Sequence, residues 1–205
     1  MSGRSLVAAA AALAVAAGAL ALAHDVRSWS RAMDRGDARF DSHPADARWH
    51  ADAWLPGDPG RRLLGFDDDL AERRAEQAFR VALATPEGFD NGADRARRRG
   101  TAEQLLSDVV ATGTDAQASR AGNLLGILVA ESADEADASI AERQAGDTFE
   151  AAIRASSANA DAKYNLELLL RRIRVVGTRE GPGSGSGTRG DSRQGAGAGT
   201  PGSGY

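Results

Sequence analysis

The first hydrophobic block of the chain is an uncharged run at residues 5–23 that contains only Ser, Gly and aliphatic side chains. About 20 apolar residues are enough to span the hydrocarbon core of a bilayer. Arg4 precedes the run, and Ala21-Leu22-Ala23 has the small-x-small form that signal peptidase cleaves. The pattern therefore predicts that residues 1–23 are either a signal anchor or a signal peptide.

Basic residues flank this run on both sides, so two signals favour opposite orientations of the run in a membrane. Arg27, Arg31 and Arg35 follow the run, and a count of basic residues near its ends favours a cytoplasmic body. A four-residue head before a hydrophobic run is, however, the ordinary form of an export signal. We expect a single-pass protein of the cell membrane with its body outside the cytoplasm, or a secreted protein after cleavage at Ala23.

Residues 24–66 have an irregular pattern that predicts partial helix. Pro44 fits the first turn of a helix, which would extend over residues 45–54. The stretch from 55 to 60, Leu-Pro-Gly-Asp-Pro-Gly, is a strong turn signal. All three Trp residues precede residue 55, so we expect this segment to pack on the core formed by the remaining helices.

Residues 67–176 show apolar side chains at helical spacing and predict one helical domain. The first helix is expected to begin at Asp67-Asp68-Asp69 and to end at Ala84. Further helices are expected over 93–111 with a break near Gly100, from Thr114 onward, over 136–155 and over about 160–176. Asp67, Asp68 and Asp69 at the first of these starts are interpreted as caps of free N–H groups and as charges that complement the helix dipole, rather than as metal ligands. No run combines β-branched residues with period-two alternation, so the fold class predicted is all-α.

A short polar break, Ser156-Ser157-Ala158-Asn159, separates the last two predicted helices and indicates a helical hairpin. Small side chains at Ala145 and Ala152 would let the helices approach closely, with Phe149 filling the adjoining space. Either Asn159 or Ser157 can cap the helix that follows.

The sequence of residues 160–170, ADAKYNLELLL, resembles the first helix of a tetratricopeptide repeat, and Leu125-Gly126 is similar to that family's Leu-Gly pair. The resemblance covers roughly residues 121–173, and it departs from the family pattern at Ser157, Lys163 and Glu167. It implies a degenerate, tetratricopeptide-like stack of helical hairpins. The residues it assigns to packing are Leu125, Gly126, Ala145, Phe149, Ala152, Tyr164 and Leu166.

This resemblance also implies a function. Stacked hairpins of this kind present a concave surface to a peptide or to a partner helix. Lys163, Asn165 and Glu167 are the candidates for partner binding, because polar residues on a largely apolar helix need either solvent or a partner. Residues 159–173 further resemble membrane-anchored tetratricopeptide proteins encoded beside MoxR-type AAA ATPases and von Willebrand A-domain proteins, which implies protein partners of those classes.

The composition of the chain excludes several classes of function. The chain has 25 basic and 29 acidic residues and a net charge of −4, without the concentrated basic face of a nucleic-acid binder. It has no cysteine, which excludes disulfides, thiolate metal sites and Cys nucleophiles. Residues 177–205 are Gly/Ser-rich and lack large aliphatic residues, so a disordered tail is predicted.

One cluster supports an alternative function. His43 and His50 lie among Asp41, Asp46 and Asp52, so the alternative is a metal-binding or hydrolytic extracytoplasmic protein centred on the two His residues. Zinc-binding helices place their His residues four apart, and this pair is seven apart. No phosphate-binding loop or nucleophile elbow is present in the sequence. We therefore expect a non-enzymatic scaffold without a cofactor.

Overall fold

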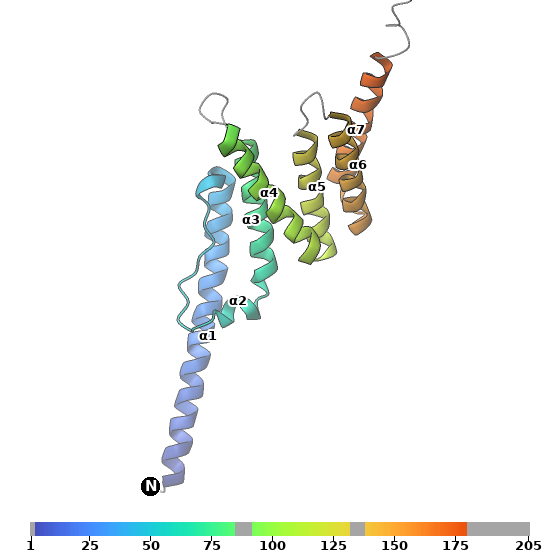
Figure 1. Ribbon diagram of the computed structural model, residues 1–205. Helices are drawn as coiled ribbons and strands as arrows, with labels where there is room; N and C mark the ends of the chain where they lie inside the picture. The colour runs from blue at the N-terminus through green and yellow to red at the C-terminus, as the bar shows by residue number, and fades with distance from the viewer. Residues whose placement is uncertain (1–2, 85–91, 132–137, 180–205) are drawn as a thin grey trace, which may run out of the picture.

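The computed structural model describes residues 3–84, 92–131 and 138–179. Within these ranges the chain forms seven α-helices and one short 3-10 helix, with no strand (Figure 1). The predicted all-α fold class is therefore confirmed. Most of the predicted tail, from residue 180 onward, lies outside the described residues.

The N-terminal helix α1, Gly3–Ser42, is longer than the sequence pattern predicted. Residues 7–20 are fully exposed and project from the body (Figure 1). Among the described residues this is the one helix that is long and apolar enough to cross a membrane. The helix does not end with the uncharged run, and its second half forms part of the body.

That second half of α1 buries one face in an N-terminal core cluster. Trp29, Met33 and Phe40 are spaced by four and seven residues, so their side chains lie on one side of the helix. They pack with Ala32, Ala47, Trp49, Ala51 and Leu70. Gly36 lies on the same face, where an added Cβ would come within 2.2 Å of Trp49 Cδ1. Only glycine fits there, because that distance is far inside van der Waals contact.

The helix predicted over residues 45–54 is wrong. The 3-10 helix η1, Pro44–Asp46, is followed by an extended segment in which Ala47, Trp49 and Ala51 are buried and the residues between them are exposed. Gln77 Nε2 donates to the carbonyl oxygens of Pro44 and Ala47 at 2.7 and 3.1 Å. This side chain satisfies backbone groups that a helix would otherwise pair internally.

The short helix α2, Pro59–Leu63, leads into five longer helices that form stacked hairpins. These are α3 (Phe66–Leu83), α4 (Gly92–Thr112), α5 (Asp115–Glu131), α6 (Ala138–Ala155) and α7 (Ala160–Arg179). Each packs on the next, and α5 also contacts both α3 and α7. Helices α3, α5 and α7 therefore form one layer of the stack (Figure 1). The break predicted near Gly100 is wrong, because α4 is continuous through it.

Local sequence signals set several helix starts. The Thr114 and Gln117 side chains cap α5 reciprocally, with Thr114 N–H donating to Gln117 Oε1 at 3.0 Å and Gln117 N–H donating to Thr114 Oγ1 at 3.4 Å. Asn159 caps α7, since its Oδ1 accepts from Ala162 N–H at 3.0 Å. The predicted Asp caps of α3 are wrong. The N-cap is Gly65 and makes no side-chain bond. The three Asp residues lie within the first turn, where their charges complement the helix dipole as predicted.

Small residues bring α5 and α6 close together. Ala145, Phe149 and Ala152 are all buried. An added Cβ at Gly126 would lie 2.6 Å from Phe149 Cε1, so the ring lies directly on the glycine. Leu125 and Leu166 are half-buried at the edges of this packing. Tyr164, in contrast, is 61% exposed, so its assignment to packing is wrong.

Candidate protein-binding groove

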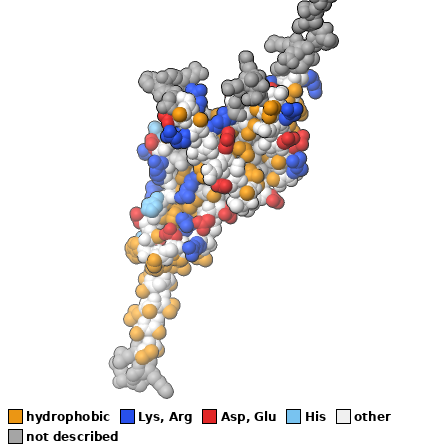
Figure 2. All heavy atoms as spheres, viewed as in Figure 1, with side chains coloured by type: hydrophobic (Ala, Val, Ile, Leu, Met, Phe, Trp, Pro, Cys, Tyr) orange, Lys and Arg blue, Asp and Glu red, His pale blue; other side chains and the backbone are white. Residues whose placement is uncertain are grey.

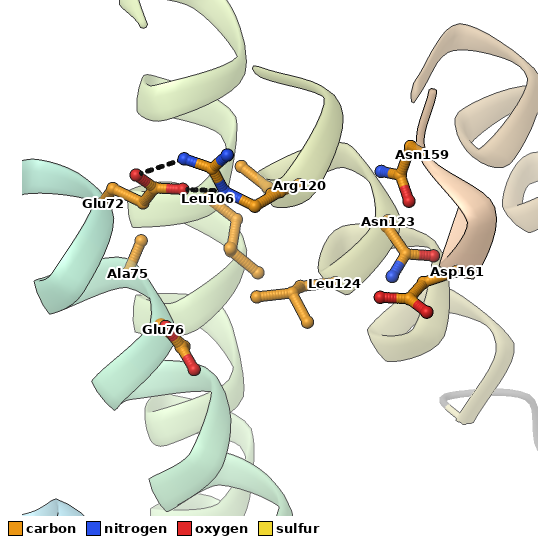
Figure 3. Close-up of a pocket in the computed structure, with 10 residues that line it drawn as sticks. Glu72, Ala75, Glu76, Leu106, Arg120, Asn123, Leu124, Asn159 and Asp161 are labelled. Atoms are coloured by element: carbon orange, nitrogen blue, oxygen red, sulfur yellow. Dashed lines mark hydrogen bonds and ion pairs between the residues drawn. The ribbon is translucent and has the colours of Figure 1, made fainter. Parts of the chain in front are cut away.

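The layer formed by α3, α5 and α7 carries a pocket of about 220 Å³, shown in Figure 3. Its apolar lining comes from Ala75, Leu106, Ala121 and Leu124. The polar residues that surround this lining are Glu72, Glu76, Arg120, Asn123, Asn159 and Asp161. Helices α3 and α5, Leu106 of α4 and the start of α7 thus contribute to one site with an apolar base and a polar edge.

Arg120 of α5 and Glu72 of α3 connect two of these helices across the edge of the pocket. Arg120 Nε and Nη2 donate to the two carboxylate oxygens of Glu72 at 2.6 and 2.8 Å (Figure 3). The Glu72 carboxylate raises the pKa of the Arg120 guanidinium. Because the Arg120 side chain is 58% exposed, the pair contributes little to stability. Its main effect is to hold a cation and an anion in fixed positions at the pocket.

A second pocket, of about 320 Å³, continues the site toward α1. It shares Glu72, Glu76 and Arg120 with the first pocket and adds Asp37, Phe40, Asp41, Arg73 and Arg80. The Arg80 guanidinium lies over the Phe40 ring at 4.4 Å from its centroid. The two pockets are therefore contiguous, and together they reach from the end of α1 to the start of α7.

Asp37 joins α1 to α3 beside this second pocket. Its carboxylate accepts from Arg73 Nε at 2.7 Å, from Arg73 Nη2 at 2.9 Å and from Trp49 Nε1 at 2.8 Å. The Arg73 hydrogen bonds are the main reason that the pKa of Asp37 falls below its ordinary value. The same contact raises the pKa of Arg73. Three side chains thus connect α1 to α3, the first helix of the layer.

A third pocket, also about 320 Å³, lies between α5, α6 and α7. It is lined by Ile127, Ala130, Glu131, Phe149, Asn165, Leu168, Leu169 and Arg172. The α7 residues that line the first and third pockets include Asp161, Asn165, Leu168 and Arg172. Their spacing of four, three and four residues places them on one face of the helix. We call the three pockets together the α3–α5–α7 groove.

A pair of amides joins α5 to α7 within the groove. Asn165 Nδ2 donates to Asn123 Oδ1 at 2.8 Å, and Asn123 is only 7% exposed. A third amide, that of Asn159, also contacts α5: its Nδ2 donates to the carbonyl and the hydroxyl oxygens of Ser119 at 3.1 and 2.9 Å. These bonds set the position of α7 against α5 and so fix the width of the groove at this end.

The predicted partner-binding residues have different positions. Asn165 lines the groove, whereas Lys163 and Glu167 line none of its three pockets. Both are exposed on another face of α7, where Glu167 accepts from Arg171 at 2.5 Å. A helix pattern separates buried positions from exposed ones, but it does not show which exposed face borders a neighbouring helix.

Sequence reasoning missed the charged residues of the first pocket, namely Glu72, Glu76, Arg120 and Asp161. Glu72 and Glu76 have i,i+4 spacing, which places both carboxylates on one side of α3. That spacing is also typical of a solvated helix face, so it gives no distinct signal. Arg120 and Asp161 are brought to the same site only by the stacking of α5 and α7.

The alternative site at His43 and His50 is not assembled. Both side chains are exposed, with His43 preceding η1 and His50 in the extended segment. Among the described residues no group of three or more His, Cys, Asp or Glu side chains is placed to hold a metal ion. The structure therefore brings together no ligand set around these two residues.

Comparison of the chain with protein-family models, with curated proteins and with solved structures finds no match. The function is therefore inferred from the groove and from the apolar half of α1.

Proposed function

We propose that this protein is a non-enzymatic, membrane-anchored scaffold that binds a segment of a partner protein in the α3–α5–α7 groove. The observation that carries the proposal is the arrangement of three pockets along α3, α5 and α7. The first two pockets share residues, and the first and third are lined by the same face of α7. Stacked helical hairpins use such faces to bind extended or helical segments.

The side chains of the first pocket define the kind of segment that it would accept. Its base is apolar, and its edge holds three carboxylates, Glu72, Glu76 and Asp161, against one cation, Arg120. Arg120 is already paired with Glu72. A complementary segment would place an apolar side chain on Leu124 and a Lys or Arg between Glu76 and Asp161, since opposite charges across an interface favour the correct partner and register.

The anchor supports a location at the cell membrane. Helix α1 runs without interruption from the apolar residues into the N-terminal core, where Asp37 and Arg73 connect it to α3. The groove would therefore be held at a fixed distance from the bilayer. We propose that the body lies outside the cytoplasm, as the short basic head before the apolar run favours.

The resemblance of residues 159–173 supports a class of partner. It favours a tetratricopeptide-like protein that works with a MoxR-type ATPase system or with a von Willebrand A-domain membrane protein. Such a partner would present the basic, partly apolar segment that the groove requires.

A charge-reversal experiment tests the groove. The full-length, affinity-tagged chain would be recovered from its own membranes after chemical crosslinking, and the copurified proteins would be quantified by mass spectrometry. Asp161→Lys places a cation at the edge of the groove. Asp147→Lys makes the same change on an exposed part of α6 that lines none of the three pockets.

We expect Asp161→Lys to lower the recovery of a specific partner about tenfold, which corresponds to about 1.4 kcal/mol. Asp147→Lys should leave that recovery unchanged. Equal effects of the two substitutions, or recovery of this chain alone from both, would contradict the proposed groove function.

A further inference from the structure

Large apolar side chains are exposed where α1 leaves the body. Trp54 and Leu63 are each 68% exposed and Leu64 is 37% exposed. They belong to residues 54–64, which turn through Gly57 and Asp58 and end in α2; we call this segment the collar. Figure 2 shows hydrophobic side chains gathered at the lower end of the body, around the base of the projecting helix. Exposed apolar groups gathered in this way mark an interaction surface.

The collar is fixed to α1 immediately after the uncharged run. The buried carboxylate of Asp25 accepts from the backbone N–H of Trp54 at 2.6 Å and from that of Leu55 at 3.1 Å. Gly60 packs on the backbone of Asp25, where an added Cβ would lie at 3.0 Å. The Trp54 ring stacks on His24 with ring centroids 3.8 Å apart.

These contacts place the collar at a defined level along the helix axis. Residues 24 and 25 follow directly on residue 23, the last of the uncharged run. When residues 5–23 span a bilayer, the collar therefore lies at the boundary between hydrocarbon and water. Trp is enriched at this boundary because its ring is largely apolar while its N–H remains polar.

The charges of the collar also match this boundary. Arg62 is exposed next to Leu63, and Arg61 lies half-buried over the Trp29 ring while paired with Asp67. Arginine side chains at this depth can extend toward lipid phosphates while their aliphatic portions remain in apolar surroundings. Arg62 thus lies beside the exposed apolar side chains of Leu63 and Leu64 on a surface that is continuous with the membrane span.

We propose that the collar is a second membrane contact, in which Trp54, Leu63 and Leu64 enter the interfacial layer of the bilayer and Arg62 faces lipid phosphates. This inference rests on the membrane anchoring within the proposed function. A single helix leaves a body free to tilt and rotate, whereas a helix together with a docked collar restricts both motions. The collar would therefore set the direction in which the α3–α5–α7 groove faces.

The absence of cysteine from the chain makes a labelling experiment direct, since one introduced cysteine carries the only label. The full-length protein with Leu63→Cys, modified with a nitroxide, would be reconstituted into vesicles of phosphatidylcholine and phosphatidylglycerol. Collisions of the nitroxide with oxygen, which concentrates in lipid, and with a water-soluble nickel chelate would be measured by electron paramagnetic resonance. Leu83→Cys is the matched control, because Leu83 is an exposed leucine at the far end of α3. Leu13→Cys reports on the span itself.

The expected result is an oxygen-to-nickel collision ratio at residue 63 that is at least severalfold higher than at residue 83, with residue 13 the highest. If residues 63 and 83 are equally accessible to the nickel chelate while residue 13 is in lipid, the collar proposal is overturned and the anchor stands. If all three labels are in water, both the collar and the anchor are overturned. Protection of residue 63 from both reagents would show a protein contact in place of lipid, and it would also overturn the proposal.

Discussion

Close contacts at single residues determine how the helices of this protein pack. Gly36 receives the Trp49 ring, Gly126 receives the Phe149 ring, and an added Cβ at Gly122 would lie 3.2 Å from the Cβ of Ala152. At each of these positions the absence of a side chain lets a neighbouring element approach closely. Gly36 and Gly126 therefore tolerate an added side chain poorly, although glycine within a helix has a low intrinsic propensity.

Phe149→Ala tests the packing of α5 on α6. The ring is 2% exposed, and its removal leaves a cavity in the centre of the stack. We expect the free energy of unfolding to fall by about 3–5 kcal/mol, as measured by chemical denaturation of the full chain. A change near zero would show that the ring does not hold the two helices together.

Gly126→Ala tests the same contact from the opposite side. The added methyl group would displace the Phe149 ring, so we expect a loss of about 1–3 kcal/mol in unfolding free energy. Phe149→Leu should relieve part of this clash, and the double variant should then lose less stability than the sum of the two single losses. Strict additivity would indicate that the two residues are not in contact.

Single residues also show how far the groove can be predicted from sequence. Asn165 was predicted because it is a polar residue within an apolar helix, and it lines the groove. Lys163 and Glu167 met the same criterion but lie on another face. Burial follows from the periodicity of one helix, whereas membership of a shared groove depends on the packing of three helices, which no local pattern encodes.

At the scale of elements, periodicity predicted the helices of the stack well and the N-terminal region poorly. The starts of α5 and α7 follow capping residues that can be read locally, namely Thr114 with Gln117 and Asn159. The change from an uncharged run to a charged segment near residue 24 resembled a boundary, yet α1 continues because Trp29, Met33 and Phe40 maintain helical spacing. The alternation at Ala47, Trp49 and Ala51 indicates extended chain, which the helix start signal at Pro44 obscured.

The start of α7 provides a test at this scale, because Asn159 both caps that helix and bonds Ser119 of α5. Asn159→Ser retains an oxygen for the cap but does not reach Ser119, whereas Asn159→Ala removes both functions. We expect Asn159→Ala to cost about 0.5–2 kcal/mol more than Asn159→Ser in unfolding free energy, which is the contribution of the cap. If the alanine variant is as stable as the serine variant, Asn159 does not stabilise α7 as its cap.

The connection between α1 and α3 gives a prediction on pH. The pKa of Asp37 is lowered from its ordinary value of 3.8, chiefly by Arg73, so the contact contributes stability above that pH. This contribution is lost as the pH falls below 3.8 and through the folded-state pKa, because the protonated carboxyl no longer pairs with Arg73. Thermal unfolding of the wild type should therefore weaken more between pH 5 and about pH 3 than that of Asp37→Asn. Parallel profiles for the two proteins would contradict the assignment.

At the scale of the whole molecule, α1 combines an exposed apolar half with a half that packs in the body. The first half of α1 exposes aliphatic side chains, while the second half is built into the core that supports the groove. Because the helix is continuous, its apolar half is connected to α3 through Asp37 and Arg73 and through the cluster around Trp49. The arrangement fits a scaffold that presents a groove at a fixed position relative to a membrane.

The most direct test of this account is site-specific photocrosslinking of the full chain in its native membrane. A photoreactive amino acid would replace Leu124 or Leu168 in the groove, and, as controls, Ser107 of α4 or Asp147 of α6, which are exposed and line none of the three groove pockets. The account predicts crosslinks to the same partner protein from both groove positions and none to it from either control. Crosslinks that form equally from all four positions, or that join only copies of this chain, would contradict the central claim that the groove binds a partner.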